Sequence, residues 1–193
     1  MKVTTDNPSP AYKLSHSQDG NWVEHSFAPI FVLETTDSST RRLVAGIPGG
    51  DPLIFEQLMC ALEGPFALLY VLHTPRGEGK AGRYQSPELS IEQFRSFIGR
   101  FGPYFRSDSR FDLWGRSASD QSTVVWDRHN LLFAYGALDR FASQLLSMGF
   151  QPGEARVPSP HQHYYRSDWD KDAAAVLAEF NWSYSPLRPE DEQ

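Results

Sequence analysis

The fold of this chain is decided by residues 111–150, FDLWGRSASDQSTVVWDRHNLLFAYGALDRFASQLLSMGF. Aromatic and β-branched side chains, which favour strands, concentrate near 111–114, 124–126 and 131–135. The links between these runs are short and polar, and Asp and Asn within them tolerate turn conformations. From 138 to 148 apolar residues recur at helical spacing until Gly149 ends the run. The stretch therefore predicts an antiparallel three-strand meander over about 111–135, followed by a helix that folds back on it.

The rest of the chain predicts further strands and three more helices. Two strands are expected between 22 and 45, and the apolar run 66–72 has the character of a strand covered on both faces, which we place in the middle of the sheet. Asp51 followed by Pro52 predicts the start of one helix, and the capping box Ser90–Gln93 predicts another that ends at Gly102–Pro103. A last helix is expected over about 169–180. The predicted class is α+β, with a mostly antiparallel sheet and four helices.

Length and composition indicate one globular domain. A chain of 193 residues with 22% charged and 40% hydrophobic residues is typical of a single folded unit. We place this domain at 21–182, with a polar N-terminal tail over 1–20 and an acidic, proline-containing C-terminal tail over 183–193. The longest apolar run is far shorter than the roughly 20 residues of a membrane helix, and the N-terminus lacks the apolar core of a signal peptide. The sequence thus predicts a soluble, cytoplasmic protein without membrane association.

Charge and aromatic content suggest a first functional hypothesis. A net charge of −6 disfavours binding to nucleic acid, which needs a basic face. Aromatic residues make up 13% of the chain and are common anchors of protein interfaces. We therefore predict a binding or regulatory module, of the kind of an inhibitor or immunity protein that covers a basic partner. Its expected interface residues are Trp114, Trp126, Tyr164, Tyr165 and Trp169.

The histidines support a second hypothesis, a small metal-assisted or acid–base enzyme. His161 and His163 lie two apart in an extended segment, so their imidazoles point to the same side and could share a divalent metal. Asp127 could orient His129 as a general base, although the same tetrapeptide is also ordinary turn chemistry. This hypothesis predicts that the three histidines converge, with Asp127 or Asp168 behind them.

A glycine-rich basic loop supports a third hypothesis, a sensor of anions or small molecules. Arg76, Lys80, Arg83 and Tyr84 could close over an anionic group. The spacing of a phosphate-binding loop is absent, and a surface ion pair also explains Arg83. No signature of a nucleotide, flavin or pyridoxal cofactor is present, so a divalent metal is the one cofactor that the sequence suggests. The sequence leaves these three functional classes open.

Overall fold

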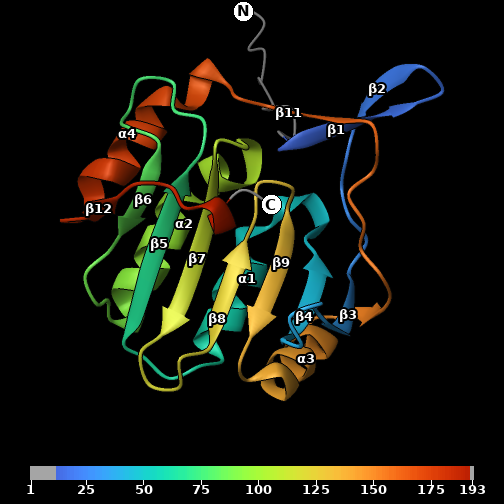
Figure 1. Cartoon of the computed structure of the whole chain (residues 1–193), viewed down its shortest axis with the longest axis horizontal. Helices are drawn as coiled ribbons and strands as arrows, with labels where there is room; N and C mark the ends of the chain where they lie inside the picture. The colour runs from blue at the N-terminus through green and yellow to red at the C-terminus, as the bar shows by residue number, and fades with distance from the viewer. Residues whose placement is uncertain (1–11, 192–193) are drawn as a thin grey trace, which may run out of the picture.

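A computed structural model describes residues 12–191 of the chain (Figure 1). The predicted α+β class is confirmed, with four α-helices in the described residues. In chain order the elements are β1 (Leu14–Gln18), β2 (Asn21–Glu24), β3 (Ile30–Thr35), β4 (Arg41–Gly46), α1 (Pro52–Cys60), β5 (Phe66–Leu72), β6 (Gly82–Gln85), α2 (Ile91–Ser107), β7 (Phe111–Ser117), β8 (Thr123–Trp126), β9 (Leu131–Tyr135), α3 (Leu138–Ser147), β10 (Gln151–Pro152), β11 (His161–His163), α4 (Asp170–Glu179) and β12 (Ser183–Ser185). Short 3-10 helices lie at Pro48–Gly50, Ser167–Trp169 and Pro189–Asp191.

The strands form a nine-stranded sheet in the order β10-β3-β4-β9-β8-β7-β5-β6-β12. All neighbours are antiparallel except β10 and β3. The predicted meander is confirmed as β7, β8 and β9. The run 66–72 is paired on both sides as β5, but the expectation that it is the middle strand is wrong, because β8 holds that position. The β3–β4 ribbon pairs with β9 and so extends the sheet on the meander's side.

The helices cover one face of this sheet, and the opposite face is partly open (Figure 1). Alternate strand residues such as Leu68, Tyr70 and Trp126 face the helices and belong to the main core. Gly115 in β7 allows α1 to approach closely, because a Cβ atom there would lie 2.7 Å from Sδ of Met59. The open face carries a smaller apolar cluster around Val125 and Phe133.

The predicted helix starts are confirmed, whereas one predicted end is wrong. The backbone N–H of Gln93 donates to Oγ of Ser90 over 3.3 Å, and that of Ser90 donates to Oε1 of Gln93 over 2.8 Å. The helix does not stop at Pro103 but continues to Ser107. Tyr104 and Phe105 in this last turn are fully buried, so their packing outweighs the hydrogen bond that proline removes.

Both segments expected to be tails contribute to the folded structure. Lys13 is fully buried, and β1 pairs with β2 and β11 in a separate three-stranded sheet (Figure 1). The remainder of the expected N-terminal tail, residues 1–11, lies outside the described residues. In the expected C-terminal tail, β12 adds to the edge of the large sheet, and Asp191 is buried beside Arg83. Each of these pairings joins segments that are far apart in the sequence. The polar composition of the two end segments alone therefore could not indicate that they form strands.

Within residues 12–191, none of the helices combines the length and apolar character that crossing a membrane requires.

Candidate metal-binding site

Three histidines from two distant segments meet at one end of the molecule. His129 comes from the turn between β8 and β9, and His161 and His163 come from β11. One ring nitrogen from each lies within 4.8 Å of those of the other two. The ring centroids are 5.3 Å apart for His129 and His161, 4.8 Å for His129 and His163, and 5.3 Å for His161 and His163. The two-residue spacing in β11 thus places both imidazoles on the side that faces the turn.

The turn that carries His129 is built around the Asp127 carboxylate. Its Oδ1 accepts the backbone N–H groups of His129 (2.9 Å) and Leu131 (2.8 Å). Asn130 adopts a left-handed φ of 64°, which asparagine tolerates better than most residues. The second carboxylate oxygen lies 2.7 Å from Nδ1 of His129. Asp127 therefore closes the turn and orients the imidazole, which leaves Nε2 of His129 as the nitrogen for a ligand.

The two histidines of β11 differ in their surroundings. Nδ1 of His161 lies 2.9 Å from the carbonyl oxygen of Pro158, which can only accept, so this nitrogen carries the proton and Nε2 has a free lone pair. Nδ1 of His163 is buried and has no hydrogen-bond partner among the described residues. Burial lowers the pKa of His163 to about 4, with repulsion from His129 and His161 as further causes. His163 is therefore neutral at pH 7, as a metal ligand must be.

A buried lysine, Lys13, donates a hydrogen bond to the turn that carries His129. Nζ of Lys13 donates to the backbone carbonyl of Asp127 over 3.0 Å, and it lies 4.7 Å and 4.6 Å from the ring centroids of Phe111 and Trp126. Burial lowers the pKa of Lys13 to about 8, although Asp127, Asp112 and Asp108 oppose this shift. The residues next to Lys13 belong to β1, which pairs with β11, so the same segment supports both sides of the cluster.

Two further histidines, which sequence reasoning missed, lie beside the cluster. His16 pairs with His161 across β1 and β11, and its ring centroid is 5.1 Å from that of His25. Each has a buried ring nitrogen without a hydrogen-bond partner among the described residues. Burial lowers the pKa of His25, and the charges of His16 and His161 add to this effect. Five of the six histidines of the chain therefore gather here. The alternation of Leu14 and His16 is typical of a strand, and it is the sequence signal that could have indicated the position of His16.

The sixth histidine and the second carboxylate candidate take no part in the cluster. Nε2 of His73 lies 2.9 Å from Oδ2 of Asp112. Asp168 lies in the 3-10 helix Ser167–Trp169 and is not a member of the histidine group. The carboxylate behind the cluster is Asp127.

The aromatic residues expected at an interface do not share one environment. Trp126 is fully buried, and its Nε1 donates to Oδ1 of Asn130 over 2.9 Å, so its expected place at an interface is wrong. Trp169 packs partly buried against the main core, whereas Trp114 belongs to the apolar cluster of the open face. Tyr165 stacks on His163 with the ring centroids 6.2 Å apart, and Tyr164 lies under the guanidinium of Arg166. Binding to a basic partner protein stays a prediction.

The basic loop is held by contacts within the chain. Nε of Arg76 lies 3.0 Å from Oδ1 of Asp170, and Arg83 pairs with the buried carboxylate of Asp191. The hydroxyl of Tyr84 donates to the backbone carbonyl of Lys80 over 2.7 Å, and it accepts a hydrogen bond from the backbone N–H of Lys80 over 3.1 Å. The two arginines have different carboxylate partners, so the geometry gives no support to their closing together over one anion.

The chemistry of the histidine cluster fits a divalent transition metal. Neutral imidazole nitrogens are preferred ligands of zinc and its neighbours in the first transition row. Two of the three rings have Nδ1 next to an acceptor, which directs Nε2 outward, and the third has a buried nitrogen without a partner among the described residues. Comparison of the chain with protein-family models, with curated proteins and with solved structures finds no match.

Proposed function

We propose that this protein binds a divalent metal of the zinc class through His129, His161 and His163, and that it uses a metal-bound water for hydrolysis. The observation that carries the proposal is the convergence of three imidazole nitrogens within 4.8 Å of one another. Zinc–nitrogen bonds of about 2.0–2.1 Å place tetrahedral ligands about 3.3 Å apart. Small rotations of the rings would bring the nitrogens to that separation.

The surroundings of the rings favour a cation over a plain histidine cluster. A histidine that binds a metal usually gives its other N–H to a carboxylate or a backbone carbonyl. His129 has the Asp127 carboxylate and His161 has the Pro158 carbonyl in this place. The other ring nitrogen of each is then left with a lone pair, and a metal ion can accept such lone pairs from several histidines together.

The number of ligands favours catalysis over a purely structural role. Structural zinc sites are usually closed by four protein ligands, whereas catalytic sites have three and keep a position for water. Zinc lowers the pKa of that water to about 7, which supplies hydroxide at neutral pH. All three histidines are half-buried, so water and a small substrate can approach them. The phenol of Tyr165, which is 37% exposed and stacked on His163, lies beside the site.

The proposal is tested by titrating chelator-treated protein with Co²⁺ and Zn²⁺. We expect one equivalent of Co²⁺ to bind with the visible absorption of a tetrahedral or five-coordinate site. Single changes of His129, His161 and His163 to Ala should each weaken binding about 100-fold or more. His73→Gln is the matched control, because His73 lies outside the cluster and should leave the titration unchanged.

Hydrolysis is measured separately with the zinc-loaded protein. We expect p-nitrophenyl acetate to be hydrolysed faster by this form than by the chelated form, and the His161→Ala variant to lose the difference. Metal binding without hydrolysis would remove the catalytic part of the proposal. Failure to bind one equivalent would remove the metal site itself.

A further inference from the structure

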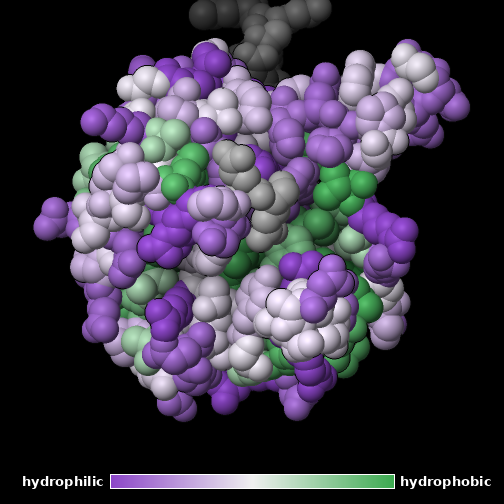
Figure 2. Space-filling model, viewed as in Figure 1, coloured by the Kyte–Doolittle hydropathy of each residue, from purple (hydrophilic) through white to green (hydrophobic). Residues whose placement is uncertain are grey.

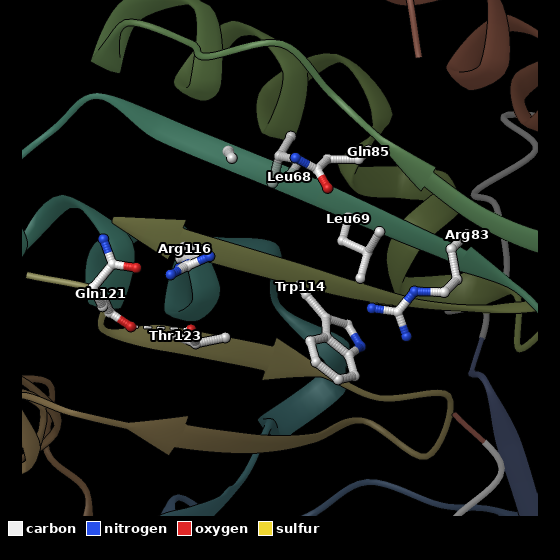
Figure 3. A pocket seen from close by; sticks show the side chains of 9 residues that line it. Leu68, Leu69, Arg83, Gln85, Trp114, Arg116, Gln121 and Thr123 are labelled. Atoms are coloured by element: carbon white, nitrogen blue, oxygen red, sulfur yellow. Dashed lines mark hydrogen bonds between the residues drawn. The ribbon is translucent and has the colours of Figure 1, made fainter. Parts of the chain in front are cut away.

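A second candidate site lies on the open face of the sheet, in a hollow of about 360 Å³ (Figure 3). This volume is within the usual range of pockets for small molecules. Figure 2 shows hydrophobic side chains exposed near the middle of this face, with hydrophilic ones around its margin. The hollow is lined by Ala67, Leu68, Leu69, Arg83, Gln85, Trp114, Arg116, Gln121 and Thr123.

The hollow results from the sizes of side chains in two neighbouring cross-strand rows. In one row Leu69 pairs with Gln85 and with Trp114, which are large residues. In the next row Arg116 pairs with Ala67 and with Thr123, both of which have short side chains. Residues two apart on a strand share a face, so the short side chains leave space beside the indole of Trp114 and below the guanidinium of Arg116.

The lining is cationic although the chain is acidic. None of the nine described lining residues is acidic, and two are arginines, in a chain with a net charge of −6. Figure 3 shows Arg116 at one end of the hollow, Arg83 at the other and Trp114 between them. Arg83 already holds the carboxylate of Asp191. The side chain of Arg116 is exposed and forms no hydrogen bond or ion pair with any described residue, so its guanidinium is available to an anion.

The space next to Arg116 suits a flat apolar group. Trp114 is half-buried, and the guanidinium of Arg83 lies 5.6 Å from its ring centroid. An adjoining hollow of about 210 Å³ shares Trp114 and Thr123 with the first and is otherwise lined by Val125, Phe133 and Tyr135. A ligand can thus have its charge on Arg116 and its ring against aromatic and aliphatic side chains. Planar rings prefer such offset contacts with aromatic residues.

We infer that the open face of the sheet binds a small planar organic carboxylate, with the carboxylate on Arg116 and the ring against Trp114. A carboxylate is favoured because arginine can bind it through two parallel hydrogen bonds, and because the neighbouring Arg83 already pairs with a carboxylate, that of Asp191, through its Nη1. The amides of Gln85 and Gln121 add donors and acceptors at the rim. This inference does not depend on the metal site.

The test uses 2-naphthoate as the probe, with the indole N–H signal of Trp114 followed by NMR and assigned with Trp114→Phe. We expect saturable binding that shifts this signal. Arg116→Gln keeps a polar side chain of similar length and should weaken binding about tenfold. Arg95→Gln is the matched control, because Arg95 is an exposed arginine of α2 on the helical layer, and it should bind like the unchanged protein.

Two further probes separate charge from shape. The uncharged amide of the same ring should bind about tenfold more weakly than 2-naphthoate, and inorganic phosphate should not saturate the Trp114 shift. Equal binding of acid and amide, or equal loss in the Arg116 and Arg95 variants, would overturn the inference. So would the absence of saturable binding at millimolar concentration. Metal content is measured in the same samples, and it should not change with Arg116→Gln.

Discussion

Nδ1 of His129 lies 2.7 Å from Oδ2 of Asp127, and this contact connects the turn of a β-hairpin to the candidate metal site. The other oxygen of the same carboxylate accepts the backbone N–H groups of His129 and Leu131. One oxygen therefore stabilises the turn, while the other orients the ring. Because the two roles use different atoms, a substitution can separate them.

Asp127→Asn should weaken metal binding more than it weakens the fold. The amide oxygen can still accept the backbone N–H groups, but the NH₂ group cannot accept the proton of Nδ1 of His129. We expect zinc affinity to fall 10- to 100-fold, and the free energy of unfolding to fall by about 1 kcal/mol. Calorimetric titration with zinc and urea unfolding measure the two effects. Glu34→Gln, which alters a carboxylate that pairs with Arg42 in the β3–β4 ribbon, is the control, and an equal loss of zinc affinity there would contradict the prediction.

The metal-free protein should become less stable in acid because of His163. Its pKa is about 4 in the folded protein and about 6.5 in an unfolded chain. Between these values the unfolded chain binds a proton that the folded protein does not, so the free energy of unfolding decreases as the pH falls from 6.5 to 4. In the His163→Gln variant, the free energy of unfolding should change less with pH between 6.5 and 4. Urea unfolding at several pH values in the presence of chelator tests this, and parallel curves for the two proteins would count against it.

Lys13 should make the free energy of unfolding depend on pH in the alkaline range. Its pKa is about 8 in the folded protein, below the ordinary 10.5, because the ammonium is buried. From pH 8 to 10.5 the unfolded chain binds more protons than the folded protein, so the contribution of Lys13 to stability rises with pH. The rise is up to about 3 kcal/mol, since each pKa unit corresponds to about 1.4 kcal/mol. Lys13→Met should lack this rise when its unfolding is compared with that of the unchanged protein at pH 8 and 10.

Gly115→Ala should destabilise the contact between β7 and α1. The new Cβ atom would lie 2.7 Å from Sδ and 3.0 Å from Cε of Met59, so the methionine side chain must move. We expect a loss of about 1–2 kcal/mol, typical of an overpacked core. Adding Met59→Ala should cost less in the Gly115→Ala background than alone, because the two side chains compete for one space.

Gly99→Ala is the matched control for this prediction. Gly99 lies within α2, and a Cβ atom there would meet no described atom within 4 Å beyond its chain neighbours and the backbone of its own helix. Alanine at this position should raise the free energy of unfolding by about 0.5–1 kcal/mol, because glycine is the weaker helix former. Thermal unfolding of both variants gives the comparison. A loss of stability at both positions would show that steric contact with Met59 is not the cause.

The local features of the fold could be predicted because a few neighbouring residues determine them. The meander and the turn at Asp127–Asn130 follow from strand-forming residues and turn chemistry within some 25 positions. The helix starts at Pro52 and Ile91 follow from capping residues only one to three positions away. The spacing of His161 and His163 likewise indicated that their rings lie on the same side of an extended segment.

The arrangement of distant segments was decided only by the tertiary structure. Pairing of β1 with β11 turned an apparently polar tail into a strand and brought His16 beside His161. Core packing extended α2 beyond Pro103 and placed Trp126 in the interior. The meeting of His129 with residues more than 30 positions away depends on how the small sheet packs against the hairpin turn. The sequence by itself determined the side chains and their local order, whereas long-range pairing and burial, which no local pattern encodes, determined which of them meet.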